Sequence, residues 1–367
     1  MRIAFLTLSL RQNGGGSHQN AITFIRALRS RGHTVNVYVF EESDPPQDIE
    51  VNKVSAQSAS FLSSITTRAD YIRDIESKTD VFFCYGHSLM WAAGRYRMKG
   101  EKPVAVYIDS HLDSMKEQGR FSMRHRIGHR VWEMIFGLRM ARHVDQILAV
   151  SPYLKGRLEQ AGFPSEKIAV VPNAFDFSEI VPKKAATDTI SILFVGRLSP
   201  EKGADVLIDA LAKLPSEDKW QLTMVGDGPE RQALENKIRS NSLANRVRIT
   251  GWQRRETLVQ EYSAADIFVL PSRVPEPFGR SLVEALHAGL PAIVPERGGA
   301  TWVAGGAGLA FRNNDVDSLA SALVSLLRDS ERRLVLAAQA SEQAARFDVE
   351  KVGKTLSETL AKISRKA

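Results

Sequence analysis

The sequence SILFVGRLSPEKGADVLIDAL, residues 191–211, runs from an apolar segment through a glycine-bounded loop into a second apolar segment. Residues 191–195 form a short apolar run, which predicts a buried strand. Residues 196–203 interrupt this pattern with Gly and Pro, and residues 204–214 follow with helical spacing. A strand, a loop and a helix in this order are half of a βαβ unit, so this stretch predicts an α/β fold with a parallel sheet.

The same alternation continues on both sides of this stretch. Upstream, Ser17 is predicted to cap a helix that ends at Gly32, and Pro182-Lys183-Lys184 forms a polar linker. We predict two Rossmann-like doubly wound domains, at 1–180 and 181–346. The strands are predicted at 3–8, 34–40, 81–85, 104–108, 146–150, 168–171, 191–195, 221–225, 246–250, 267–270 and 291–294, and the later helices at 204–214, 231–241, 257–264 and 280–287, with a largely helical remainder.

Composition narrows the class of protein. The chain has 367 residues, 43% of them hydrophobic and 25% charged, which is typical of a soluble globular protein with two cores. The opening MRIAFLTLSL is interpreted as a buried strand rather than a signal peptide. Cys84 is the single cysteine, which excludes an intrachain disulfide, and its apolar surroundings predict a buried structural thiol. These features favour a cytoplasmic protein.

The chain is basic, with a net charge of +7. The excess is shared between the two halves, and no nucleic-acid-binding motif is present, so we expect no nucleic-acid partner. A basic cleft for phosphorylated substrates, or contact with an anionic membrane, would account for the charge equally well.

Candidate site residues lie in loops that follow strands, where open α/β sheets bind ligands. Asn13-Gly14-Gly15-Gly16-Ser17 precedes a helix, whose free N–H groups suit a phosphate, although a flexible turn explains it as well. Arg197 and Lys202 could hold a diphosphate. The alternative interpretation is that they are two solvated surface charges. Residues 226–230 are interpreted as a structural turn.

The most specific loop is EPFGRSLVEA, residues 276–285. Glu276 precedes the predicted helix, Gly279 and Ser281 lie about its amino terminus, and Glu284 falls in its second turn. Two carboxylates would therefore be available to sugar hydroxyls on either side of N–H groups that suit a phosphate.

Together these motifs resemble glycosyltransferase family 4, a family of retaining, nucleotide-sugar-dependent enzymes with the GT-B fold, in which two Rossmann-like domains face each other across a cleft. The resemblance covers nearly the whole chain and is carried most strongly by residues 191–299. The matching segments are FVGRLSPEKGADVLIDAL, LTMVGDGPER, IFVLPS, EPFGRSLVEALHAGLPAIV and Gly298-Gly299, preceded by VSPYLKGRL and VVPNAFDFSEI.

The resemblance implies a role for each candidate. Arg197 and Lys202 match the pair that grips the donor diphosphate. Glu276 matches the residue that contacts the transferred sugar, and Glu284 the residue that usually holds the ribose. His111 matches a strand-end histidine near the sugar. The resemblance further assigns donor binding to Gly15, Gly16, Phe278, Gly279, Arg280, Ser281 and Leu282.

The resemblance also implies that residues 347–367 form a helix that crosses back to the first domain. Two departures stand out: Gly298-Gly299-Ala300-Thr301-Trp302 lacks the acid of the common Gly-Gly-x-x-Glu, and Asn173-Ala174 replaces Asn-Gly. The first is expected to alter donor or acceptor selectivity.

The expected reaction is transfer of a hexosyl unit, with retention of configuration, from a nucleotide-diphosphate sugar to a glycan, lipid-linked or small-molecule acceptor, as in cell-envelope polysaccharide synthesis. No cofactor or metal is expected: cations and helix N–H groups would stabilise the leaving diphosphate, and Asp315-Val316-Asp317 is interpreted as a helix cap. The nucleotide base is left open, with residues 251–254 as a candidate contact.

Alternatives remain. A non-catalytic nucleotide-sugar-binding protein, a phosphorylase with pyridoxal phosphate, and a sugar-nucleotide epimerase are each compatible with the architecture. Residues 116–143 contain seven Lys or Arg against two acids, interleaved with large apolar residues. This pattern is typical of a domain helix, and its alternative is peripheral contact with the anionic inner face of the membrane.

Overall fold

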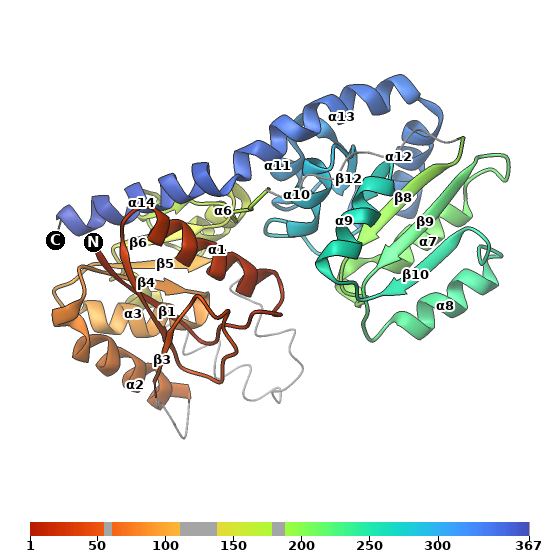
Figure 1. Cartoon of the computed structure of the whole chain (residues 1–367). Helices are drawn as coiled ribbons and strands as arrows, with labels where there is room; N and C mark the ends of the chain where they lie inside the picture. The colour runs from red at the N-terminus through yellow and green to blue at the C-terminus, as the bar shows by residue number, and fades with distance from the viewer. Residues whose placement is uncertain (55–60, 111–137, 178–187, 367) are drawn as a thin grey trace. The chain divides into compact units, whose positions relative to one another are not determined.

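The computed structural model describes residues 1–54, 61–110, 138–177 and 188–366, which form two compact units (Figure 1). One unit comprises Met1–Phe175 with Val349–Ala367, and the other comprises Asp176–Asp348. The boundaries predicted from the sequence, after residues 180 and 346, differ from these by a few residues. The predicted linker at 182–184 lies outside the described residues.

The first unit is built on a seven-stranded parallel sheet with the strand order β3-β2-β1-β4-β5-β6-β7. Successive strands are therefore added first on one side of β1 and then on the other, because β1 lies between β2 and β4. The strands are β1 Arg2–Thr7, β2 Thr34–Val39, β3 Val51–Lys53, β4 Val81–Tyr85, β5 Val104–Ile108, β6 Gln146–Ala149 and β7 Ile168–Val170.

Helices cover this sheet because their apolar positions recur at helical spacing. In α1 the buried residues include Ala21, Phe24, Ile25 and Leu28, the positions that predicted it. The α-helices are α1 Gly16–Ser30, α2 Phe61–Asp74, α3 Met90–Arg97, α5 Leu138–Ala141, α6 Pro152–Gln160 and α14 Val349–Lys366, with short 3-10 turns η1 Glu76–Lys78, η2 His87–Leu89 and η5 Ser165–Lys167.

The carboxyl-terminal helix α14 packs beside α1 in the first unit, although more than 300 residues separate them in sequence (Figure 1). The Val349 N–H donates to the Phe175 carbonyl at 2.8 Å, where the chain returns to this unit. His33 Nε2 lies 2.6 Å from Ser357 Oγ, and Arg31 pairs with Glu350 at 2.7 Å. These contacts make α14 a structural part of the unit.

The second unit has a six-stranded parallel sheet with the order β10-β9-β8-β11-β12-β13. Strand order changes side at β8, which lies between β9 and β11. The strands are β8 Ile190–Val195, β9 Trp220–Val225, β10 Val247–Gly251, β11 Ile267–Val269, β12 Ala292–Pro295 and β13 Gly308–Phe311. The helices are α7 Ala204–Ala212, α8 Arg231–Ser240, α9 Arg255–Ala264, α10 Arg280–His287, α11 Ala300–Ala304, α12 Val316–Arg328 and α13 Ser330–Ala344, with 3-10 turns η6 Pro200–Lys202, η7 Gly305–Ala307 and η8 Ala345–Phe347.

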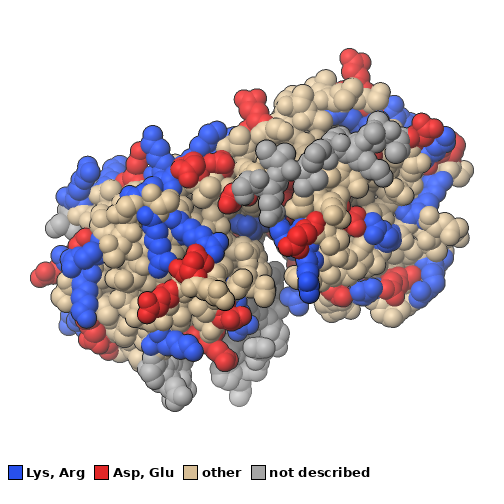
Figure 2. Space-filling model, viewed as in Figure 1, with Lys and Arg blue, Asp and Glu red and all other residues tan. Residues whose placement is uncertain are grey.

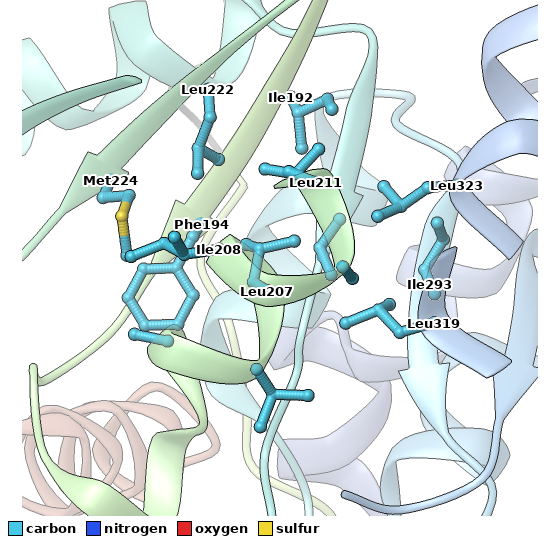
Figure 3. Close-up of a cluster of buried hydrophobic side chains, with 14 of the residues drawn as sticks. Ile192, Phe194, Leu207, Ile208, Leu211, Leu222, Met224, Ile293, Leu319 and Leu323 are labelled. Carbon is cyan, nitrogen blue, oxygen red and sulfur yellow. The ribbon is translucent and has the colours of Figure 1, made fainter. Parts of the chain in front are cut away.

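The core of the second unit is continuous from the sheet to the helices (Figure 3). Ile192 and Phe194 of β8 are 1% exposed and pack with Leu207 and Leu211 of α7. Leu319 of α12 is fully buried in the same cluster. Burying each such side chain contributes roughly 1.5–3 kcal/mol, so this packing fixes the loops at the carboxyl ends of the strands.

One local prediction of a helix cap was wrong and another was confirmed. Ser17 does not cap α1, because the helix begins at Gly16 with Gly15 as its N-cap, and the Ser17 hydroxyl instead donates to Asp109. Asp315 caps α12 through the Ser318 N–H at 2.8 Å, as predicted. In the described part of the chain, no helix is both long and apolar enough to cross a membrane.

Candidate functional site

The two loops that carry the strongest predicted residues meet at the switch point of the second sheet. One loop follows β8 and contains Arg197 and Lys202, and the other follows β11 and contains Glu276. β8 and β11 are neighbouring parallel strands, and successive strands are added on opposite sides of β8. This switch point is therefore where a doubly wound sheet binds its ligand.

Lys202 and Glu276 contact each other directly. Lys202 Nζ lies 2.6 Å from Glu276 Oε1, and the hydroxyl of the fully buried Ser272 donates to the same oxygen at 2.6 Å. Glu276 is 8% exposed. Its Oε2 accepts no hydrogen bond from any residue that the structure describes, so one carboxylate oxygen is fixed by protein donors and the other retains its acceptor capacity.

The backbone around Glu276 is fixed by Gly298 and Gly299. The Gly299 N–H donates to the Glu276 carbonyl at 2.6 Å. Gly298 has a φ of +118°, and a Cβ there would lie 2.7 Å from the same carbonyl oxygen. Any larger residue at 298 would therefore push Glu276 away from Lys202.

Arg197 is exposed at the mouth of the same sheet edge. Its guanidinium makes no hydrogen bond or ion pair with the described residues of the chain. The loop around it is nevertheless held by backbone hydrogen bonds to the segment after β9. The fully buried Leu198 donates its N–H to the Asp227 carbonyl at 2.9 Å, and its carbonyl accepts the Glu230 N–H at 3.0 Å. A cation on an anchored loop is available for an anionic ligand.

The predicted anion site at the start of α10 has the expected backbone. Gly279 is its N-cap, with a φ of +97°, and the helix begins at Arg280 as predicted. The side chains of Phe278 and Leu282 are 3% and 0% exposed, so their contribution to a ligand is limited to backbone groups. The first N–H groups of a helix have no intrahelical acceptor and suit a phosphate.

Phe278 belongs to an aromatic cluster with Trp302 and Phe347. Its ring centroid lies 5.2 Å from that of Phe347 and 6.4 Å from that of Trp302. The Arg346 guanidinium lies over the Trp302 ring at 5.0 Å. At position 302, where the Gly-Gly-x-x-Glu pattern would place an acid, this chain therefore has an aromatic residue that packs against Phe278.

Glu284 lies in the second turn of α10, and both of its carboxylate oxygens are engaged. Arg255 NH1 donates to Oε1 at 3.1 Å, and the Tyr262 hydroxyl donates to Oε2 at 2.9 Å. Burial, reinforced by the Glu284 carboxylate, raises the pKa of Tyr262 well above its usual value, so its hydroxyl remains a donor. A carboxylate has about four acceptor positions, so two stay available for ribose hydroxyls.

In the first unit, the predicted glycines lie at the exposed start of α1. Gly15 is the N-cap and Gly16 the first helical residue. Beside them, Asp109 Oδ2 accepts hydrogen bonds from the Ser17 hydroxyl at 2.5 Å and the Tyr85 hydroxyl at 3.3 Å. This helix start therefore already lies near a protein carboxylate, which lessens its attraction for a second anion.

His87 lies at the end of β4, which is next to β5. Its Nδ1 lies 3.2 Å from Ser110 Oγ, and its buried Nε2 has no hydrogen-bond partner among the described residues. Burial lowers the pKa of His87, and the Asp109 carboxylate opposes this shift. His111, the predicted histidine near the sugar, lies outside the described residues, as do residues 116–137 of the hypothetical membrane segment.

Sequence reasoning missed the partners that orient the acids. Ser272 follows β11 within the quoted IFVLPS segment, yet only its position after a strand indicated a role. Arg255 and Tyr262 are seven residues apart on α9, a spacing that places both on one helix face. His87 and Asp109 lie within two residues of the ends of neighbouring strands, and that shared feature could have identified them.

Charges on one face of the molecule are mixed in sign. On the face shown in Figure 2, Lys and Arg are interspersed with Asp and Glu over both units, without a large patch of one sign. The excess positive charge of the chain is thus spread out on this face. Local pairs such as Lys202 with Glu276 set the electrostatics of the site.

Comparison with known proteins identifies the family. Residues 14–179 match the family model described as Glycosyltransferase Family 4, and residues 176–343 match the model described as Glycosyl transferases group 1. The chain belongs to glycosyltransferase family 4. It is therefore a glycosyltransferase, and the resemblance inferred from its motifs is confirmed.

Characterised relatives of this glycosyltransferase differ in substrate. It is 25% identical over 337 residues to a mannosylfructose-phosphate synthase of Agrobacterium fabrum, covering 78% of this chain and 72% of the relative. It is 29% identical over 243 residues to a GDP-mannose-dependent alpha-(1-6)-phosphatidylinositol monomannoside mannosyltransferase of Mycobacterium tuberculosis, covering 59% and 62%.

Solved structures confirm the GT-B fold. A sucrose-phosphate synthase of Thermosynechococcus elongatus matches with a TM-score of 0.81 at 20% identity, with all of both chains covered. Anabaena HepE in complex with UDP-glucose matches with a TM-score of 0.75 at 23% identity, covering 99% of this chain and all of the other. Both domains predicted from the sequence as Rossmann-like are thus parallel-sheet α/β units of this fold.

Proposed function

We propose that this enzyme transfers a hexosyl unit from a nucleotide-diphosphate sugar, and that the second unit holds the donor. The observation that carries the proposal is the shared contact of Lys202, Ser272 and Glu276 at the switch point between β8 and β11. It joins a cation suited to a phosphate with a carboxylate suited to a sugar hydroxyl.

Arg197, Lys202 and the first N–H groups of α10 would bind the diphosphate. Lys202 Nζ has three donors and uses one on Glu276, so it can donate to a phosphate oxygen without leaving the carboxylate. Arg197 would add charge at the leaving oxygen. Stabilising that oxygen lowers the barrier to cleavage of the sugar–phosphate bond.

Glu276 would orient the transferred sugar through its Oε2, while Glu284 would accept hydrogen bonds from the ribose. Their surroundings support this division. Glu276 is buried and fixed through Oε1, whereas Glu284 is held by Arg255 and Tyr262 further along α10. Trp252, on the loop 251–254, is 70% exposed and supports that loop as the contact for the nucleotide base.

We further propose that the reaction retains the anomeric configuration and needs no metal ion. The two cations of the 196–203 loop support the second statement, because they supply the positive charge that a departing diphosphate requires. Retention follows the family resemblance, with the departing phosphate accepting the acceptor's proton on the same face of the sugar. His111 remains the proposed histidine near the sugar.

The proposed acceptor is a hydroxyl group of a glycan, a lipid-linked sugar or a small molecule, in a cytoplasmic enzyme of glycan synthesis. Relatives support this range: one is a mannosylfructose-phosphate synthase and another a phosphatidylinositol monomannoside mannosyltransferase. If the acceptor is lipid-linked, we also propose peripheral membrane contact through residues 116–143.

The test is release of nucleoside diphosphate by the purified enzyme in the presence of EDTA. UDP-, GDP- and ADP-hexoses are supplied without acceptor, and wild type is compared with Arg197→Ala and Glu276→Ala. Slow release from one donor class, lost in both variants, is the expected result. Removing a donor to the developing charge typically costs about 10²–10³-fold in rate.

Two other outcomes would count against parts of the proposal. Release that stops with EDTA and returns with Mg²⁺ would contradict metal independence. A wild-type protein that neither releases nor binds any of the three nucleotides, measured by thermal shift, would contradict the donor site itself. Anomeric NMR of the product, once an acceptor is found, tests retention.

A further inference from the structure

Arg273, in the loop that follows β11, connects three separate segments of the second unit. Its Nε donates to Asn314 Oδ1 at 2.8 Å and its NH1 to the Pro200 carbonyl oxygen at 3.1 Å. Its NH2 donates to the Asp205 carboxylate. The guanidinium thus joins the start of α7, the turn η6 and the loop that precedes α12.

Two of these contacts act on the turn that ends in Lys202. Arg273 NH1 holds the Pro200 carbonyl, and the Arg273 backbone N–H donates to the Glu201 carbonyl at 3.0 Å. Lys202 is the next residue. On its other side, Gly203 has a φ of +65°, and a Cβ there would lie 2.1 Å from the Pro271 carbonyl oxygen. The backbone on both sides of Lys202 is therefore fixed against the β11–α10 loop.

Two carboxylates interact with this guanidinium. Asp205 forms an ion pair with it, and Glu230 interacts with it electrostatically. Burial and the Asp205 carboxylate raise the pKa of Glu230, and Glu230 Oε2 has no hydrogen-bond partner among the described residues. A cation is needed here for charge balance, and only Arg presents directed donors to several acceptors at once.

We propose that Arg273 is a positioning residue for the donor diphosphate. It contacts neither the diphosphate nor the sugar. It holds η6 so that Lys202 reaches a phosphate oxygen and Glu276 together. This inference rests on the proposed function of the Lys202–Glu276 site.

The test compares Arg273→Lys with Arg246→Lys. Arg246 is a matched control because it also donates to two loop carbonyls, of Asp218 at 3.0 Å and Ser216 at 2.8 Å. It precedes β10, however, and so lies at the opposite end of the strands. The dissociation constants of UDP, GDP and ADP, and of the corresponding nucleosides, are measured for wild type and both variants, along with Tm.

In Arg273→Lys, we expect the nucleoside diphosphate to bind about 10-fold more weakly or worse, the cost of losing one charge-assisted hydrogen bond. Binding of the nucleoside should not change, since it lacks phosphates. Arg246→Lys should lose stability without altering either constant. If Arg273 had a purely structural role, Arg273→Lys would weaken the binding of nucleoside diphosphate and nucleoside together, or of neither.

A milder variant, Asn314→Gly, provides a second test in case Arg273→Lys does not fold. Asn314 has a φ of +58°, which Gly adopts readily, so this change removes only the Oδ1 acceptor of Arg273. Asn314→Gly should weaken binding of the nucleoside diphosphate but not of the nucleoside, and by a smaller factor than Arg273→Lys does. Wild type that binds none of the nucleotides overturns both the proposed function and this inference. Nucleotide binding that is equally strong in wild type and in the folded variants overturns this inference alone.

Discussion

The Lys202 ammonium and the Glu276 carboxylate lie 2.6 Å apart at the carboxyl edge of the second sheet. The family resemblance assigns these two groups to different parts of one ligand, the diphosphate and the sugar. Their contact means that a displacement of either group moves the other. Binding of the phosphate and orientation of the sugar are therefore expected to be coupled.

Replacing Lys202 should remove catalysis more than stability. In Lys202→Met we expect kcat to fall about 10²–10³-fold, because a donor to the leaving group is lost. The matched control is Lys213→Met, which breaks an exposed pair between Lys213 and Asp317. Steady-state kinetics with the donor found active should show no loss in the control. Similar kinetics in the two variants would contradict the role of Lys202.

Ser272→Ala should disturb Glu276 specifically. The change removes one of the two donors to Glu276 Oε1 and should cost about 1 kcal/mol of stability. Ser263→Ala is the control, since Ser263 is also buried but donates only to the Val259 carbonyl of its own helix. Both should lose stability in urea unfolding, and only Ser272→Ala should raise KM for the donor. An equal KM in both would exclude a role for Ser272 in the site.

The ribose contact of Glu284 can be tested with deoxynucleotides. Wild type should prefer a nucleoside diphosphate to its 2′,3′-dideoxy analogue, and Glu284→Gln should lose most of that preference. Tyr262→Phe, which removes the donor to Oε2, should reduce the preference by less. Titration calorimetry of both ligands with each variant gives the comparison. A preference that survives in Glu284→Gln would assign the ribose to other residues.

His87 predicts a loss of stability in mild acid. Burial lowers the pKa of His87 in the folded state, so the unfolded chain binds a proton first as pH falls. Its contribution is complete above the unfolded pKa of about 6.5 and is lost as pH falls through the folded pKa. His87→Gln should flatten this part of the unfolding free-energy curve. An identical acid slope in wild type and His87→Gln would contradict the assignment.

The sequence predicted many strands and helices to within a few residues, because their hydrophobic periodicity is strong, but it did not predict the 14-residue helix α2. α10 begins at Arg280 and ends at His287 as predicted, and β4 and β5 have the expected bounds. The edge strands β3 and β13 were missed. Val51–Lys53 has one apolar residue and Gly308–Phe311 begins with glycine, so each depends on pairing with its neighbour rather than on its own pattern.

Within the site, the sequence predicted the two acids but not the residues that orient the charged groups. Glu276 and Glu284 were identifiable because they flank a helix start. Ser272, Tyr262 and Arg273 orient charged groups through contacts between separate loops and helices, and such contacts have no local pattern. The same holds for Trp302, whose packing on Phe347 depends on residues far along the chain.

The most direct measurement of the central claim is the affinity of Glu276→Gln for the intact nucleotide sugar and for the free nucleoside diphosphate. If Glu276 Oε2 orients the sugar while Lys202 and Arg197 hold the diphosphate, the variant loses much more affinity for the nucleotide sugar than for the free diphosphate, whose binding changes only as far as Lys202 shifts. It then loses both the added affinity contributed by the sugar and turnover. Unchanged affinity for the nucleotide sugar, with unchanged turnover, would contradict the account.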